Sequence, residues 1–221
     1  PQFFATNVFN VATEGLDFRM APVRAEPDPE PELWAKWGLT EDDPNLTGPA
    51  RVERAARLLL APETVLTILR DFALYRHARD ASENDLKILP RYPQVEAAVA
   101  IHDKVLAGGP GGLIWHHQGS GKTELMAFAA TRLLRDPAVG HPTVIVIADR
   151  KDLVRQTAEM FETAGMPRMH VPGNKRELWR LLKRDERGVI ITTVHKFAEA
   201  GHLNDRDNII DGTGSADLIY A

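Results

Sequence analysis

The chain has 221 residues and a formal net charge of −4; 43% of its residues are hydrophobic and 26% are charged. This length can bury the core of one large or two small domains, and the charge excludes a uniformly basic nucleic-acid-binding surface but not a local basic one. The chain has no cysteine, which excludes disulfides, thiolate catalysis and cysteine-bound zinc. No apolar run approaches the roughly 20 residues that cross a bilayer, so we expect no membrane partner and a cytoplasmic location.

The first predicted region covers residues 1–85 and combines short strands with helix. Apolar and charged residues alternate around Phe18, which is typical of a half-buried strand. The run 25–34 alternates proline with acidic residues and is predicted to be a loop or linker. Residues 51–76 are predicted to be helical, with Pro62 in a first turn. The helical period places four apolar side chains on one face, namely Val65, Leu66, Leu69 and Phe72.

The second predicted region covers residues 86–221 and alternates helices with buried strands. The expected strands are 111–115, 143–149 and 188–194, and the expected helices are 95–106, 124–134, 151–163 and 174–183. Asn174 followed by Glu177 is typical of a capping box at the start of the last helix. Strands that alternate with helices indicate an α/β fold whose parallel sheet is covered on both faces.

A nearly side-chain-free turn lies between the predicted strand 111–115 and the helix that follows it. Gly119, Ser120 and Gly121 can bend so that consecutive backbone N–H groups point into one hollow, and the helix dipole there also favours an anion. Lys122 would reach the β- and γ-phosphates of a nucleotide, and the hydroxyl of Thr123 would ligate Mg²⁺. The motif therefore predicts binding of ATP with Mg²⁺; the alternative is a glycine turn without a ligand.

The strict phosphate-loop pattern fails at one position, where His116 replaces the first glycine. The adjacent His117 raises the possibility of a metal site. Neighbouring strand residues point to opposite faces, however, which disfavours a shared metal. We interpret both histidines as residues that shape the loop or lie beside a phosphate.

Several stretches around this loop together resemble superfamily 2 DNA helicases and translocases. More narrowly, they resemble the restriction (R) subunit of type I restriction-modification enzymes. In that family a Trp-His pair precedes "QGSGKS/T", and later strands carry "DR…DL…Q" and "TT..KF". The opening segment "NVFNVATEGLDFRMAPV" also resembles a part of the family that follows its nuclease core. The matching stretches here are Trp115–Thr123, Asp149–Gln156 and Thr192–Phe197, with Pro90–Ala98 upstream and Asn208–Ile210 downstream.

This resemblance implies a fold and site residues. The fold is a parallel-sheet RecA-like P-loop domain, preceded by the C-terminal part of an α+β nuclease-like domain. Gln94 would hydrogen-bond the adenine edge of ATP, although it could instead be an exposed residue at a helix start. Arg150, Thr193 and Lys196 would contact the DNA backbone beyond the ends of two strands. For Arg150, a helix cap or a surface ion pair is an alternative.

The resemblance also implies the activity of the whole protein. It would be an ATP-dependent type I site-specific deoxyribonuclease that moves along double-stranded DNA and cuts it, with separate methyltransferase and specificity subunits as partners. The acidic pair needed for ATP hydrolysis is not apparent, because Gly212 follows Asp211. We expect that pair beyond this segment or among residues missing near Asp211, the nuclease residues upstream of Pro1, and this segment alone to be inactive.

Three other functions fit part of the pattern. One is another superfamily 2 helicase or remodeller from a defence system, which sequence upstream of Pro1 would separate from a nuclease subunit. A small P-loop kinase is less compatible, because its loop usually lies near the N-terminus and no arginine-bearing lid is apparent. The third is a module that binds nucleotide without hydrolysing it, which an ATPase measurement would distinguish.

Overall fold

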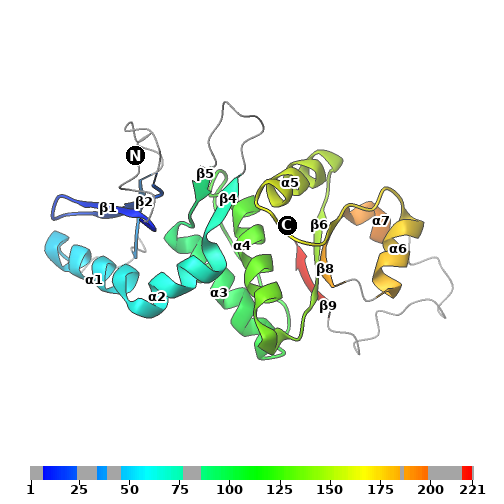
Figure 1. Ribbon diagram of the computed structural model, residues 1–221, viewed down its shortest axis with the longest axis horizontal. Helices are drawn as coiled ribbons and strands as arrows, with labels where there is room; N and C mark the ends of the chain where they lie inside the picture. Colours follow the sequence, from blue (N-terminus) through cyan, green and yellow to red (C-terminus); the bar gives the residue numbers. More distant parts are fainter. Residues whose placement is uncertain are drawn as a thin grey trace. The chain divides into compact units, whose positions relative to one another are not determined.

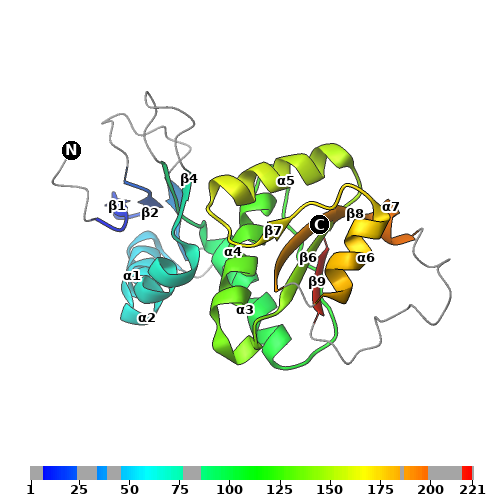
Figure 2. The ribbon, with the colours of Figure 1, turned by 45° about the vertical axis from the view of Figure 1, so that its right-hand side comes forward.

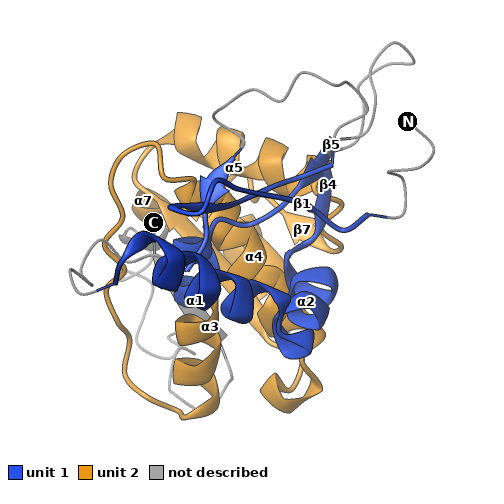
Figure 3. Ribbon diagram, turned by 90° about the vertical axis from the view of Figure 1, so that its left-hand side faces the viewer, with its two compact units in different colours: residues 1–97 blue, residues 98–221 orange. Residues whose placement is uncertain are grey.

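The computed structural model describes residues 7–23, 34–38, 46–76, 86–184, 187–198 and 216–220. The chain divides into two compact units, unit 1 (Pro1–Ala97) and unit 2 (Ala98–Ala221) (Figure 1, Figure 3). The predicted boundary after residue 85 falls inside unit 1. Asp211 lies outside the described residues, as does almost all of the predicted linker at 25–34. Within the described ranges, no helix combines the length and the apolar character that a membrane crossing requires.

Unit 1 begins with a small antiparallel sheet. Its three strands are β1 (Asn10–Thr13), β2 (Phe18–Ala21) and β3 (Ala35–Lys36), in the order β1-β2-β3. Phe18 and Met20 of β2 are buried, as the alternating pattern predicts. Asp17 accepts from the ammonium of Lys36 at 2.8 Å, and this hydrogen bond holds the pKa of the carboxyl below its usual value.

The predicted helix at 51–76 is interrupted. It consists of α1 (Gly48–Leu60), α2 (Pro62–Thr67) and the π-helical turn η3 (Ile68–Phe72), after which the chain pairs β4 (Leu74–Arg76) with β5 (Leu86–Ile88). Pro62 opens α2, as expected. The predicted apolar face is wrong in part: Phe72 is buried as predicted, but Leu66 and Leu69 are exposed, and Ile68 is buried instead. The π turn changes the angle between successive residues, so one helical period does not describe this segment.

Helix α3 (Tyr92–Leu106) confirms the predicted helix at 95–106 and begins slightly earlier. The ring of Tyr92 meets the ring of the buried Trp37 edge-on at 5.5 Å between centroids. Burial raises the pKa of Tyr92 to about 12, with a further contribution from its hydrogen bond to Glu96. The Tyr92 phenol is therefore kept neutral at the start of the helix.

The centre of unit 2 is a parallel sheet with the strand order β7-β8-β6-β9 (Figure 2). The strands of this sheet are β6 (Thr143–Ala148), β7 (Met169–His170), β8 (Gly188–Thr193) and β9 (Ala216–Tyr220). Unit 2 also contains the helices α4 (Lys122–Arg135), α5 (Lys151–Thr163), α6 (Lys175–Lys183) and α7 (Val194–Ala198). A 3₁₀ turn, η4 (Pro137–Val139), follows α4. The strands predicted at 143–149 and 188–194 and the helices predicted at 124–134, 151–163 and 174–183 are confirmed.

Both faces of this sheet are covered by helices. On one face, Ile145 and Ile190 form a buried cluster with Leu178 and Leu181 of α6. Side chains alternate along a strand, so the fully buried Val144 points to the other face, where α4 and α5 contact β6. Figure 2 shows the sheet between α4 and α6. The predicted α/β fold with a covered parallel sheet is therefore present.

The predicted strand at 111–115 is wrong. Residues 111–117 have no regular secondary structure, and the side chains of Leu113 and Trp115 are 85% and 86% exposed. A short apolar run does not by itself distinguish a strand from an irregular segment, because five residues carry too little periodicity. The preceding glycine- and proline-rich run, residues 108–112, also opposes regular pairing.

Candidate functional site

The glycine turn stands directly before α4. Residues 118–121 turn the chain, and both Gly119 and Gly121 have φ of +79°, in the left-handed region that glycine adopts without strain. Gly121 is the N-cap of α4, whose first residue is Lys122. A Cβ built on Gly119 would meet nothing within 4 Å, so the space above the turn is open.

The ammonium of Lys122 points back over this loop. Its Nζ donates to the carbonyl oxygens of His116 at 2.9 Å and of His117 at 2.7 Å. The backbone N–H of Ser120 also donates to the carbonyl of His117, at 3.4 Å. The two histidines therefore shape the loop through their backbone carbonyls, while the lysine holds a positive charge at the mouth of the turn.

These residues fit the phosphates of a nucleotide and a divalent metal ion. A positive charge, the N-terminal end of a long helix and free space above Gly119 together suit an anion. Thr123 lies in the first turn of α4 and is partly exposed. Because the predicted residues Gly119 to Thr123 are consecutive, local structure alone brings them together.

Gln94 is found in unit 1, in the first turn of α3, and its side chain is only 4% exposed. Its Oε1 accepts from the backbone N–H of Arg91 at 2.7 Å, and its own N–H donates to the carbonyl of Arg91 at 2.9 Å. The side chain therefore helps to cap the start of α3. Its predicted contact with adenine stays a prediction.

The ends of β6 and β8 form a second candidate site. Ala148 and Thr193 are paired in register, so the residues that follow the two strands emerge at the same edge of the sheet. They surround a pocket of about 430 Å³. This is the edge at which open α/β sheets place ligands. The residues lining the pocket are Asp149, Arg150, Lys151, Thr193, His195 and Lys196.

The pocket brings the three predicted DNA-contacting residues together, since Arg150 follows β6, Thr193 ends β8, and Lys196 lies in α7 directly after it. The guanidinium of Arg150 lies 3.3 Å from the carboxylate of Asp149, and both side chains are exposed. Lys196 donates to the backbone carbonyl of Pro172, in the loop that leads into α6. The pocket therefore holds several cations and one carboxylate, an arrangement suited to a phosphate group.

Sequence reasoning did not include Lys151 and His195 in this site, although both line the pocket. Their signal was available, because each follows a predicted strand within three residues of its end. Lys151 is also the first residue of α5, so its position is determined by the strand-to-helix turn.

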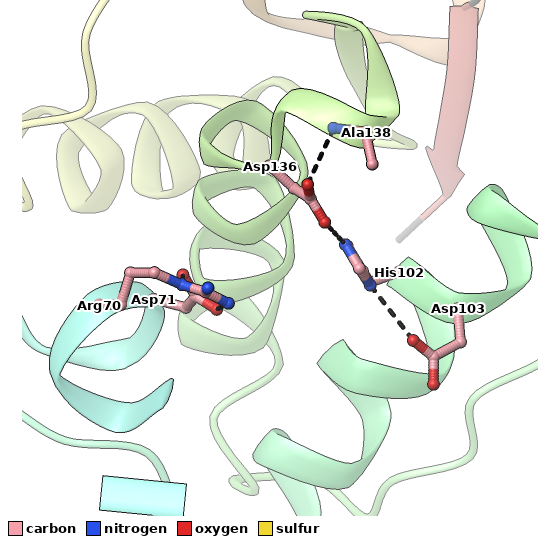
Figure 4. A network of polar contacts seen from close by, with 6 residues as sticks. All are labelled: Arg70, Asp71, His102, Asp103, Asp136 and Ala138. Atoms are coloured by element: carbon pink, nitrogen blue, oxygen red, sulfur yellow. Dashed lines mark hydrogen bonds and ion pairs between the residues drawn. The ribbon is translucent and has the colours of Figure 1, made fainter. Parts of the chain in front are cut away.

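A buried histidine network was also missed. His102 of α3 lies between two carboxylates, with Nε2 2.6 Å from Oδ2 of Asp136 and Nδ1 3.2 Å from Oδ1 of Asp103 (Figure 4). Asp136 also accepts from the backbone N–H of Ala138 at 2.9 Å. The network ties the end of α4 to α3, and no local pattern reveals it because His102 and Asp136 are far apart in sequence.

Strand β9 was not predicted either. It pairs in parallel with β6, and Tyr220 lies opposite Ile147 near the carboxyl end of that strand. The carboxyl end of β9 therefore lies at the same edge of the sheet as the carboxyl end of β6.

The chain was compared with known proteins. Residues 93–211, more than half of the 221 residues, match the family described as SWI2/SNF2 ATPase. The chain is 33% identical over 168 residues to the type I restriction enzyme HindI endonuclease subunit of Haemophilus influenzae, an alignment that covers 69% of this chain and 16% of the relative. It is 34% identical over 120 residues to a type I restriction enzyme endonuclease subunit of Staphylococcus aureus, covering 54% of this chain and 13% of the relative. It is also 34% identical over 119 residues to one of Staphylococcus saprophyticus, covering 54% and 12%.

Proposed function

Because the chain belongs to the SWI2/SNF2 ATPase family, we propose that it is a segment of the motor subunit of a type I restriction endonuclease. The relatives support this narrower assignment, since they are endonuclease subunits of such enzymes. The chain spans less than a fifth of their length, with 16% of the Haemophilus influenzae relative covered. The activity of the whole protein is therefore part of the proposal.

In this proposal unit 2 is an incomplete RecA-like lobe that binds ATP with Mg²⁺. The observation that carries it is the position of Lys122, at the start of α4 with its ammonium over the glycine turn. The ammonium would exchange its two carbonyl partners for the β- and γ-phosphates, and Thr123 would hold the metal ion. Gly119, Ser120 and Gly121 would present their backbone N–H groups, and Gln94 would bind the adenine edge.

The pocket at the strand ends would contact duplex DNA. Arg150 and Lys196 would bind backbone phosphates, and the hydroxyl of Thr193 would supply a neutral hydrogen bond. Such contacts position a protein on DNA without reading its sequence. Recognition would then fall to the separate specificity subunit, which the whole protein would bind together with a methyltransferase subunit.

Residues 1–85 would be the C-terminal part of the nuclease-like domain that makes the double-strand break. A remodeller or helicase of another defence system would share the ATPase site but lack the nuclease. Cleavage of duplex DNA by the full-length protein with its partner subunits, in the presence of ATP and Mg²⁺, separates the two possibilities. Translocation without cleavage would favour the remodeller.

The central experiment measures ATP hydrolysis by the full-length protein in the presence of duplex DNA. We expect Lys122→Ala to reduce hydrolysis by at least about 100-fold, because the charge that stabilises the transferring phosphoryl group is lost. Lys104→Ala is the matched control: Lys104 is an exposed lysine of α3. The control should hydrolyse ATP at the wild-type rate. Equal rates for wild type and Lys122→Ala would contradict the proposed function.

A further inference from the structure

Helix α6 carries a row of arginines that the proposed function does not use. Arg176, Arg180 and Arg184 are exposed and follow one another at every fourth position, so they lie one above the other along the helix. We call these three residues the arginine row. The row is about 12 Å long at about 1.5 Å per residue. It stands out in a chain whose formal net charge is −4.

The opposite face of α6 determines where the row points. Leu178 and Leu181 are buried against Ile145, Ile147 and Ile190 of the sheet. Residues two positions from a buried leucine on a helix point to the far side, so Arg176 and Arg180, on either side of Leu178, face away from the sheet, and the exposed Arg184 follows at the C-cap. Its direction is therefore set by the core of unit 2.

No acidic residue of α6 neutralises the row. The helix has one carboxylate, Glu177, and that group accepts from the backbone N–H of Gly173 at 2.8 Å. Elsewhere an exposed arginine has a carboxylate on its own helix, as Arg57 has Glu53 at 2.8 Å. The three arginines of the row have no ion pair within the described part of the chain. Asp185 and Glu186, which follow the row, lie outside the described residues.

Helix stability does not account for the row. Cations near the C-terminal end of a helix interact favourably with its dipole, which suits Arg180 in the last turn and Arg184 at the C-cap. Arg176 lies in the first turn, where the dipole disfavours a positive charge. A cation at both ends of the same face is better explained by a ligand that is negatively charged along its length.

We infer that the arginine row binds the phosphate backbone of duplex DNA, adjacent to the pocket at the strand ends. The inference rests on the proposed function, because it assumes that DNA lies at this edge of the sheet. At 3.4 Å of axis per phosphate on one strand, the row would span about three to four phosphates. The loop that enters α6 is held by the bond from Lys196 to the carbonyl of Pro172, so the row begins next to the pocket.

The test compares DNA affinity and its salt dependence in the full-length protein. The variant Arg176→Gln with Arg180→Gln removes two charges of the row, and Arg57→Gln with Lys104→Gln removes two exposed helix cations elsewhere. Fluorescence anisotropy with a duplex of mixed sequence gives the dissociation constant between 50 and 200 mM salt, a range over which each phosphate contact contributes about 0.9 to the logarithmic slope. Circular dichroism establishes that all the proteins are folded.

We expect the row variant to bind about tenfold more weakly, with a slope shallower by roughly 1.8, while the control variant behaves as wild type. Arg176→Lys with Arg180→Lys keeps the charges and should retain most of the affinity. If wild type binds duplex and the row variant matches it in affinity and slope, this inference alone is overturned. It is also overturned if the control or the lysine variant loses as much. If the wild-type protein does not bind duplex DNA, both this inference and the proposed DNA-binding function are overturned.

Discussion

Gly188, at the start of β8, is required there because of its backbone conformation and its close contact with the residue that precedes β7. Its φ is +151°, a conformation that side-chain-bearing residues rarely adopt. A Cβ at this position would overlap the backbone carbonyl of Arg168, and that same carbonyl accepts from the N–H of Val189 at 3.0 Å. The strand can therefore begin beside β7 only because residue 188 has no side chain.

We expect Gly188→Ala to lower the free energy of unfolding by about 2 to 4 kcal/mol, from backbone strain together with the overlap. Urea denaturation measures the change. Gly140→Ala is the matched control, since Gly140 also has positive φ, +78°, but has open space around its would-be Cβ. That control should lose only about 1 kcal/mol. Equal losses in the two variants would show that the overlap with Arg168 is relieved at no cost.

At the scale of elements, α6 shows why some helices can be read from sequence. Its N-cap is Asn174, whose Oδ1 accepts from the N–H of Glu177 at 3.0 Å, as the capping pattern predicts. The carboxylate of Glu177 accepts a hydrogen bond from the backbone N–H of Gly173 rather than from that of Asn174. These interactions span few residues, so they are encoded locally. The segment α1–η3 was predicted less well because its π turn has no comparable local signal.

The cap of α6 should contribute measurably to stability. Asn174→Ala removes the acceptor for the N–H of Glu177 and should lower the free energy of unfolding by about 1 kcal/mol. Asn174→Ser retains a side-chain oxygen that can cap, and it should stay close to wild type. Both are measured by urea denaturation of the same protein. A serine variant as unstable as the alanine variant would mean that Asn174 acts through something other than capping.

At the scale of the whole molecule, charge is distributed unevenly. The chain is acidic overall, yet the cations of the strand-end pocket gather at the carboxyl edge of one sheet, and the arginine row begins beside them with Arg176. Among the described residues that line this pocket, Asp149 carries the carboxylate. Paired with Arg150 at 3.3 Å, it would compete with a DNA phosphate for the guanidinium. In the proposed complex with DNA, its charge should weaken binding and favour release.

Asp149→Asn should therefore raise the affinity for duplex DNA by roughly threefold to tenfold at low salt, because a like charge within a few ångströms of the phosphate is removed. Asp152→Asn is the control: Asp152 is exposed on α5 and does not line the pocket. It should change the affinity little. The dissociation constants come from the same anisotropy measurement. An increase of the same size in both variants would indicate a general effect of net charge.

The turns, strands and helix caps that depend on residues close together in the chain can be predicted from local sequence alone. The glycine turn with Lys122 and Thr123, the strands around Val144 and Ile190 and the cap at Asn174 all follow from local pattern, since glycine conformation, β-branched runs and capping act within a few positions. Which distant segments lie together follows from the fold and not from local pattern. The fold brought Arg150 to Thr193 and Lys196 through the register of β6 and β8, and it joined His102 to Asp136. It also left Leu113 and Trp115 outside the sheet, because pairing requires a partner strand that the apolar run itself does not specify.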